Sequence, residues 1–171
     1  MSRWYCAYTK PGAELWARTN LWERGFEVYL PQYMKRRRHA RRTDYVAAPL
    51  FARYLFVAAD LDTGVSRGIT YAPGVSNLIA FGGDPAPVPD AVISELRAHE
   101  GDDGMMDLDR GLGIASRYQP GDKAQIAEGP MADSVGIFPA QTAYQRVFIL
   151  MELLGRQVQV KVHARALSPE N

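Results

Sequence analysis

Residues that build redox, metal or nucleophilic centres are scarce in this sequence of 171 residues. Its one cysteine, Cys6, cannot form an internal disulfide, which suits a reducing compartment. The three histidines, His39, His99 and His163, are scattered and show no metal-ligand spacing. There is no phosphate-binding glycine loop and no nucleophile elbow. We therefore expect a protein that is not an enzyme, with no catalytic residues, no metal and no cofactor.

Long hydrophobic runs are also missing. The longest candidate, residues 147–154, is interrupted by Glu152 and is far shorter than the ~20 residues that span a bilayer. The first residues contain no hydrophobic signal core. Hydrophobic residues make up 47% and charged residues 23%, which is typical of a globular protein and excludes a wholly disordered chain. We expect a cytoplasmic protein with no membrane partner.

The net charge of +1 conceals a strong asymmetry along the chain. Residues 1–60 contain eleven Lys and Arg against five Asp and Glu, whereas residues 61–111 contain three against nine. The densest cluster, the basic run, is residues 35–42, where six of eight residues are Lys or Arg. Like charges this close together need a polyanion or full solvation. We favour sequence-independent, salt-sensitive contact with DNA phosphates, and keep a solvated hairpin tip as the alternative.

Apolar periodicity and turn residues outline an amino-terminal unit of strands and helices. Strands are predicted at residues 4–9, 27–30, 49–57 and 75–81, and helices at residues 13–24 and 90–101. Gly25 is the predicted C-cap of the first helix, and Asp90 is the predicted N-cap of the second. Residues 60–69 are helix-like but weakened by Gly64. The basic run and residues 44–47 together predict an extended hairpin or a loop.

A change of composition separates a second unit. Residues 101–116 contain four glycines and four aspartates with little periodicity, which predicts a linker between residues 1–100 and 117–171. Several short strands, the clearest at residues 157–162, predict a small β-barrel. Residues 146–156 combine helix propensity with a following strand pattern. Such mixed signals are typical of a two-state segment, or of ordinary tertiary override of local propensity.

Motifs in this order resemble a known family. Those of the first unit are Trp4-Tyr5, Pro49-Leu50-Phe51 followed by Tyr54-Leu55-Phe56-Val57, Gly74-Val75 and Pro89; those of the second are Pro120-Gly121-Asp122-Lys123 and Glu128-Gly129-Pro130. They resemble the NGN and KOW domains of NusG-type transcription elongation factors. Gly74-Val75-Ser76, Phe81-Gly82 and Val88-Pro89 are similar to the specialised RfaH-like branch. The chain departs from that branch with Val65-Ser66-Arg67-Gly68 in place of a polar loop, Pro73 in place of Arg and Ala48 in place of Glu.

The resemblance implies an α+β fold. The first unit would be an αβ sandwich, an antiparallel sheet flanked by helices, linked to a KOW β-barrel for which a helical hairpin is the alternative. The implied function is elongation and antitermination by binding the clamp helices of the largest RNA polymerase subunit, without catalysis. A ribosome-associated KOW-type RNA-binding protein and a free-standing DNA-binding repressor are the alternatives.

The resemblance also assigns three sets of residues. Polymerase binding is expected at Tyr8, Phe51, Tyr54, Phe56, Phe81, Ile93 and Leu96, for which a plain core role is the alternative. DNA binding, to upstream duplex or to the non-template strand, is expected at Lys10, Trp16, Arg18, Asn20, Lys35, Arg36, Arg37, Arg38, Arg41, Arg42, Arg67 and Thr70. The alternative is that Trp16 fills the core and that Lys10 is only solvated. Binding of a small-subunit ribosomal protein or the Rho terminator is expected at Ile126, Phe138, Phe148 and Leu150, for which the core of the small barrel is the alternative.

Overall fold

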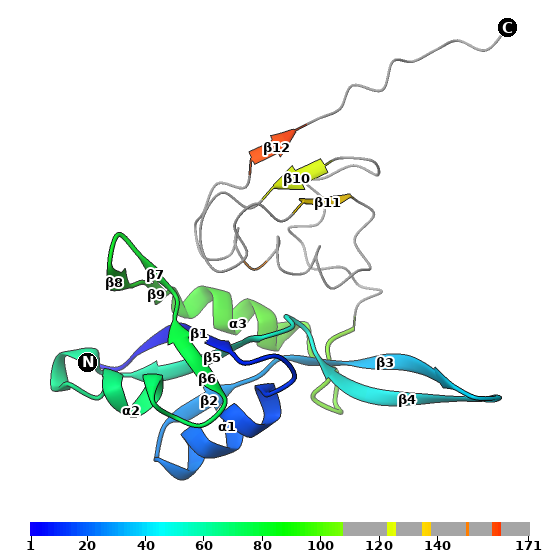
Figure 1. Ribbon diagram of the computed structural model, residues 1–171, viewed down its shortest axis with the longest axis horizontal. Helices are drawn as coiled ribbons and strands as arrows, with labels where there is room; N and C mark the ends of the chain where they lie inside the picture. Colours follow the sequence, from blue (N-terminus) through cyan, green and yellow to red (C-terminus); the bar gives the residue numbers. More distant parts are fainter. Residues whose placement is uncertain (108–122, 126–134, 138–149, 151–158, 162–171) are drawn as a thin grey trace, which may run out of the picture. The chain divides into compact units, whose positions relative to one another are not determined.

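The computed structural model describes residues 1–107, 123–125, 135–137, 150 and 159–161 (Figure 1). The chain divides into two compact units, Met1–Leu112 and Gly113–Asn171, which are described separately. The first unit is built on an antiparallel sheet accompanied by helices, which confirms the predicted α+β class. In the part of the chain that is described, no helix has the length and hydropathy to cross a membrane.

The main sheet of the first unit is antiparallel, with strand order β2-β5-β1-β6. Its strands are β1 (Arg3–Thr9), β2 (Glu27–Tyr29), β5 (Tyr54–Ala59) and β6 (Val75–Leu78). A further short strand, β9 (Pro87–Val88), pairs with the amino-terminal part of β1. The central pair, β1 and β5, places Cys6 opposite Phe56 and Tyr8 opposite Tyr54. Both strands are buried along almost their whole length, because the sheet is covered on both faces.

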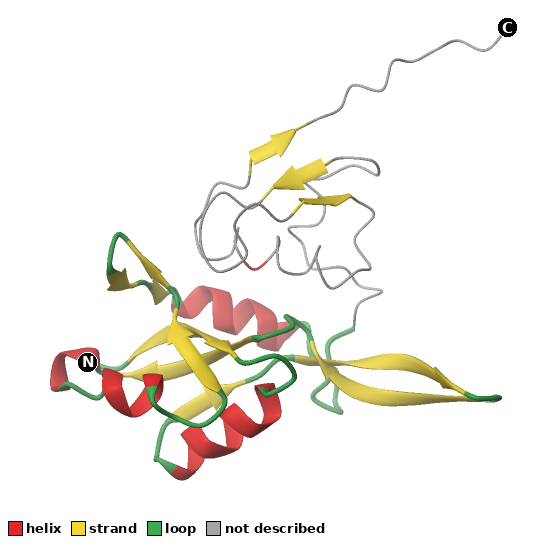
Figure 2. Cartoon of the chain, viewed as in Figure 1, coloured by secondary structure: helices red, strands yellow, loops and turns green. Residues whose placement is uncertain are grey.

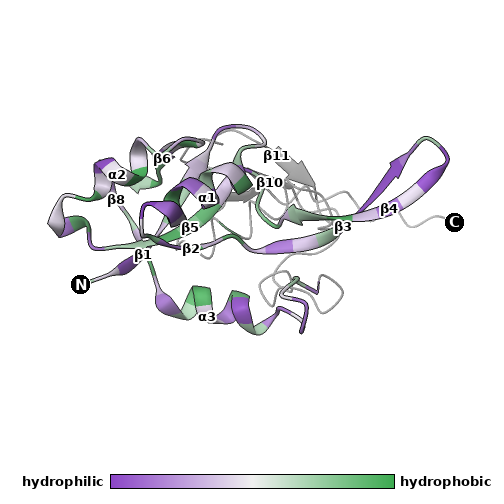
Figure 3. Cartoon of the chain, turned by 90° about the horizontal axis from the view of Figure 1, so that it is seen from below, coloured by the Kyte–Doolittle hydropathy of each residue, from purple (hydrophilic) through white to green (hydrophobic). Residues whose placement is uncertain are grey.

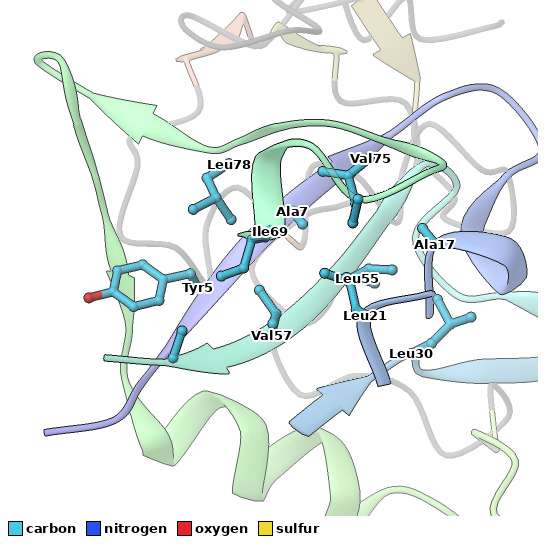
Figure 4. Packing of buried hydrophobic residues seen from close by; sticks show 12 residues of the cluster. Tyr5, Ala7, Ala17, Leu21, Leu30, Leu55, Val57, Ile69, Val75 and Leu78 are labelled. Carbon is cyan, nitrogen blue, oxygen red and sulfur yellow. The ribbon is translucent and has the colours of Figure 1, made fainter. Parts of the chain in front are cut away.

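Helices cover the two faces of this sheet unequally (Figures 2 and 3). On one face lie α1 (Glu14–Glu23) and α2 (Ser66–Thr70), and on the other lies α3 (Asp90–Ala98). Side chains from alternate strand positions, such as Leu55 and Val57, meet Leu21 of α1 and Ile69 of α2 in one apolar cluster (Figure 4). The remaining alternate positions face α3.

Helix α1 confirms the predicted first helix and its end. The N–H of Gly25 donates to the carbonyl of Trp22 at 2.9 Å, and that of Phe26 donates to the carbonyl of Leu21 at 3.1 Å. These are the two bonds of a Schellman motif, and Gly25 has the left-handed φ of +86° that the motif needs. The chain therefore turns sharply from α1 into β2.

The basic run forms the hairpin that was one of the two predictions for it. Strands β3 (Gln32–His39) and β4 (Arg42–Pro49) pair antiparallel from Gln32 opposite Pro49 to His39 opposite Arg42. A two-residue turn closes the hairpin, with Ala40 at a φ of +54°. The hairpin projects away from the main sheet (Figure 1), and the side chains of its outer part, residues 34–45, are exposed to solvent.

Three predicted elements of the first unit differ from the observed ones. The strand predicted at residues 49–57 is interrupted after Pro49 by a turn in which Arg53 has a φ of +72°. The helix predicted at residues 60–69 is split at Gly64, φ +77°, into the 3-10 turn η1 (Leu61–Thr63) and α2. The strand at residues 75–81 divides into β6 and β7 (Ala80–Phe81), and β7 pairs with β8 (Asp84–Pro85).

The predicted cap of α3 is wrong by one residue. Pro89 occupies the N-cap position and Asp90 is the first helical residue, without a side-chain cap bond. Proline suits a position that needs no N–H donor, and the Asp90 carboxylate still lies at the positive end of the helix. The helix ends at Ala98, before the predicted Gly101.

The second unit contains an antiparallel sheet among its described residues. Its strands are β10 (Lys123–Gln125), β11 (Val135–Ile137) and β12 (Gln159–Lys161), with β10 in the centre. Strand β12 lies within the strand predicted at residues 157–162. Residues 146–156, whose mixed signals indicate a two-state segment, lie outside the described residues except for Leu150, which is buried.

Candidate functional site

The sheet face opposite the apolar cluster of Figure 4 carries aromatic side chains. Strand alternation places Tyr8 of β1 and Tyr54 and Phe56 of β5 on this face, because Ala7, Leu55 and Val57 belong to the other. The rings of Tyr8 and Tyr54 lie across the strand pair, with centroids 5.1 Å apart and planes tilted by 50°. Cross-strand neighbours of this kind stabilise one register of the pair.

Two further rings complete what we call the aromatic face: Tyr8, Tyr29, Phe51, Tyr54 and Phe56. Phe51, from the turn before β5, meets Phe56 edge-on with centroids 6.4 Å apart. Tyr29 of β2 stacks on Phe56 at 6.1 Å. Edge-on and offset arrangements are the ones that aromatic quadrupoles favour.

Helix α3 packs against the same side of the sheet. Its Arg97 guanidinium lies 5.0 Å from the centroid of the Tyr29 ring and 5.5 Å from that of Trp4. Ile93 and Leu96, one helical turn apart, are both buried. All the polymerase-binding candidates whose side chains are described are buried, and the Phe81 side chain lies outside the described residues.

Two hydroxyl groups on the aromatic face have different surroundings. The Tyr29 hydroxyl donates to Oε1 of Glu100 at 2.5 Å, and burial together with this carboxylate raises the pKa of Tyr29. Tyr54 is fully buried, and its hydroxyl has no hydrogen-bond partner in the described part of the chain. Burial raises the pKa of Tyr54 as well, so this hydroxyl is a neutral donor at physiological pH.

Sequence reasoning missed Arg53, which borders the aromatic face. Its backbone N–H donates to Oε1 of the buried Glu14 at 2.8 Å, and its Nε donates to the carbonyl of Thr9 at 3.0 Å. Its guanidinium stacks on the Tyr8 ring. No spacing in the sequence indicates this arrangement, since it depends on three segments that meet only in the folded chain.

The basic hairpin displays all its predicted DNA-binding cations on the surface. Lys35, Arg36, Arg37, Arg38, Arg41 and Arg42 are all exposed. Alternation divides the strand cations between two faces. Arg37 lies opposite Asp44 and donates to its carboxylate at 2.7 and 3.2 Å. On the other face Arg36 lies opposite Tyr45, which is 63% exposed.

The structure divides the remaining DNA-binding candidates. Lys10 precedes α1. Its backbone N–H donates a hydrogen bond of 2.8 Å to the carbonyl of Gly74, in the segment after α2. Trp16 is 58% exposed, so it does not fill the core, and Asn20 donates to its carbonyl. Arg18 lies about 200° around the helix from Trp16, at 3.6 residues per turn. It does not join a common site with Trp16 and Asn20.

The remaining candidates lie on α2 and in the second unit. Arg67 and Thr70 lie on α2, on the same side of the sheet as α1. Ile126, Phe138 and Phe148, expected in a partner site of the second unit, lie outside the described residues, and Leu150 is buried. Among the residues described, no group of three or more His, Cys, Asp or Glu is arranged to hold a metal ion.

The chain is similar to one protein family and to a solved structure. The family model described as "Transcription termination factor nusG" matches residues 2–97, which is more than half of the chain. A solved structure titled "Domain interaction in Thermotoga maritima NusG" is similar with 21% sequence identity, covering 80% of this chain and 78% of that one, at a TM-score of 0.40.

Proposed function

Because this chain belongs to the NusG family of transcription factors, we propose that it binds RNA polymerase through the aromatic face and promotes transcript elongation. The proposed contact is with the clamp helices of the largest subunit, and its effect is to suppress pausing or termination, as in the RfaH-like branch. The second unit, as a KOW domain, would recruit a small-subunit ribosomal protein or Rho. The protein acts by binding alone, without a catalytic step.

The observation that carries this proposal is the Tyr54 hydroxyl. It is buried among aromatic rings and has no partner in the described residues, although buried polar groups are almost always hydrogen-bonded. A docked protein that supplies an acceptor would satisfy it. Tyrosine is also among the residue types that contribute most binding energy at interfaces. Since the ring is fully buried here, docking requires that this face become accessible.

Tyr54→Phe tests the proposal without disturbing the packing. It removes only the hydroxyl, so we expect the fold to persist while affinity for purified RNA polymerase falls about tenfold, the effect of losing one buried hydrogen bond. Pausing assays on a defined template should lose the elongation effect in parallel. Tyr71→Phe is the matched control, because Tyr71 is 77% exposed and directly follows α2, which lies on the other face of the sheet. Unchanged polymerase affinity in Tyr54→Phe would refute the assignment.

The basic hairpin is the proposed contact for DNA phosphates. Replacing Arg36 and Arg38 with Gln removes two exposed cations, and the salt dependence of DNA binding should become shallower by about two in log–log slope. The control is Arg37→Gln with Asp44→Asn, which removes an ion pair without changing the net charge. A slope for the Arg36 and Arg38 variant that is unchanged from that of the unaltered chain would assign the hairpin to solvation.

The ribosome-associated alternative makes the opposite prediction. An RNA-binding protein of that kind holds purified RNA tightly in the absence of polymerase. We expect only weak, salt-sensitive RNA binding, measured by fluorescence anisotropy with a labelled oligonucleotide. Tight RNA binding that survives physiological salt would favour the alternative.

A further inference from the structure

A groove lies between α1 and β2, on the side of the sheet opposite the aromatic face. It has a volume of about 340 Å³ and is lined by Arg18, Thr19, Trp22 and Val28. We call these four residues the α1 groove. Trp22 is 71% exposed, and Leu15, two helical turns before it, is 48% exposed. Positions 15, 18, 19 and 22 follow the i, i+3, i+4, i+7 spacing of one helix face.

This face of α1 is not needed to hold the helix on the sheet. Ala17 and Leu21, which are fully buried, perform that packing from another side of the helix. A short helix that leaves a Trp and a Leu in solvent has a second apolar face without a partner in the described residues. Trp and Arg are the residue types most enriched where binding energy concentrates at protein interfaces.

The charges around the groove indicate the kind of partner. The hydrogen bond of Arg18 is a long one, 3.4 Å, to the neutral Oε1 of Gln32, and no carboxylate of the described residues forms an ion pair with it. Nearby, Glu27 is paired with Arg97 at 3.3 Å, and Glu23 is followed in the sequence by a residue of opposite charge, Arg24. Arg18 is therefore a cation without a paired carboxylate beside an apolar hollow. A partner that carries an apolar side chain next to a carboxylate would complement it. Arg18 alone does not provide the row of cations that tracks a nucleic-acid backbone.

We propose that the α1 groove is a docking surface for an acidic amphipathic helix of a protein partner. An apolar side chain of that helix would enter the hollow between Trp22 and Val28, and a neighbouring carboxylate would pair with Arg18. Helix-on-helix packing of this kind uses the ridge formed by residues 15, 18, 19 and 22. The surface is separate from the aromatic face and does not depend on polymerase binding.

The test uses the full chain and synthetic peptides. The probe, the Glu peptide, is a helical peptide with Leu at i, i+3, i+4 and i+7 and Glu at the other positions. The control, the Lys peptide, carries Lys in place of each Glu. Titration is followed by ¹H–¹⁵N NMR. The Glu peptide should shift the Trp22 indole N–H and the amides of Arg18, Thr19 and Val28, and the Lys peptide should bind at least tenfold more weakly.

Variants separate docking from loss of fold. Trp22→Ala and Arg18→Gln should each lower affinity for the Glu peptide about tenfold. Tyr71→Ala, which removes an exposed aromatic ring elsewhere, should change it less than about twofold. Because Trp22 is mostly exposed, its truncation should leave the circular dichroism spectrum unchanged.

Three results would overturn the proposal. The first is no shift at the α1 groove with the Glu peptide at millimolar concentration. The second is that the Lys peptide binds as tightly as the Glu peptide, or that both groove variants bind the Glu peptide as tightly as the unaltered chain does. The third is a single-stranded DNA oligonucleotide that shifts the same amides more strongly than the peptide, which would assign the groove to nucleic acid.

Discussion

The guanidinium carbon of Arg53 lies 4.0 Å from the centroid of the Tyr8 ring. The two residues are far apart in the sequence, and the contact exists because β1 and β5 pair in the register that sets Tyr8 opposite Tyr54. Arg53 reaches the ring from a left-handed backbone conformation, which costs a non-glycine residue about 1 kcal/mol. The cation–π contact and the bond to Thr9 offset that cost.

At Arg53, a glycine substitution should therefore be less destabilising than an alanine substitution. Arg53→Ala loses the ring contact and the hydrogen bond while it keeps the strained backbone, so we expect a loss of about 1–2 kcal/mol of unfolding free energy. Arg53→Gly loses the same contacts but relieves the strain, and should be about 1 kcal/mol more stable than Arg53→Ala. Urea denaturation measures both. An Ala variant as stable as the Gly variant would contradict the strain argument.

Gly74 should be intolerant of any side chain. It has a φ of +89°, and a Cβ there would lie 3.0 Å from the backbone nitrogen of Ala17 and 3.1 Å from its Cα. We expect Gly74→Ala to lower the unfolding free energy by about 2–4 kcal/mol, from backbone strain and overpacking together. Gly12→Ala is the control, because Gly12 also has a positive φ, +68°, but has open space around its Cβ position. Similar losses for both variants would show that packing against α1 contributes nothing.

The ion pair of the hairpin should be visible in a pH titration. Hydrogen bonding to Arg37 holds the pKa of Asp44 below its ordinary value of 3.8. The stabilisation that this pair gives is therefore complete above pH 3.8 and is lost as the pH falls through the lower folded pKa. In Arg37→Gln the pKa of Asp44, followed by carboxyl ¹³C NMR, should move up toward 3.8. An unchanged titration would mean that the pair does not form in solution.

Cys6 should react only when the chain unfolds. It is 1% exposed in β1, and burial raises the pKa of its thiol, so almost no thiolate forms at neutral pH. We expect alkylation by iodoacetamide at pH 7.5 to be slow in the native protein and rapid in urea. The sequence contains no other cysteine, so mass spectrometry reports this single site. Rapid labelling without denaturant would show that β1 opens locally.

The sequence predicts the presence of helices and strands more reliably than the residues at which they begin and end. The strand and helix periods and the Gly25 cap are local properties, so residues close in the sequence were sufficient to predict β1, α1 and α3. The boundaries at residues 50–53 and at Asp90 were predicted wrongly. The left-handed conformation of Arg53 and the N-cap position of Pro89 depend on the packing of neighbouring segments. Charge clustering alone singled out the basic run, whereas the polymerase-binding candidates came from the resemblance to NusG-type factors, because composition could not have chosen them.

The sequence by itself determined which residues share a strand face, where the charge concentrates and which family the chain resembles. These follow from the two-residue period of strands, from composition and from motif order. Only the tertiary structure decided that Tyr8 meets Tyr54 and that Arg53 stacks on Tyr8. Such relationships depend on register and packing between segments distant along the chain, and those interactions have no signature in the local sequence.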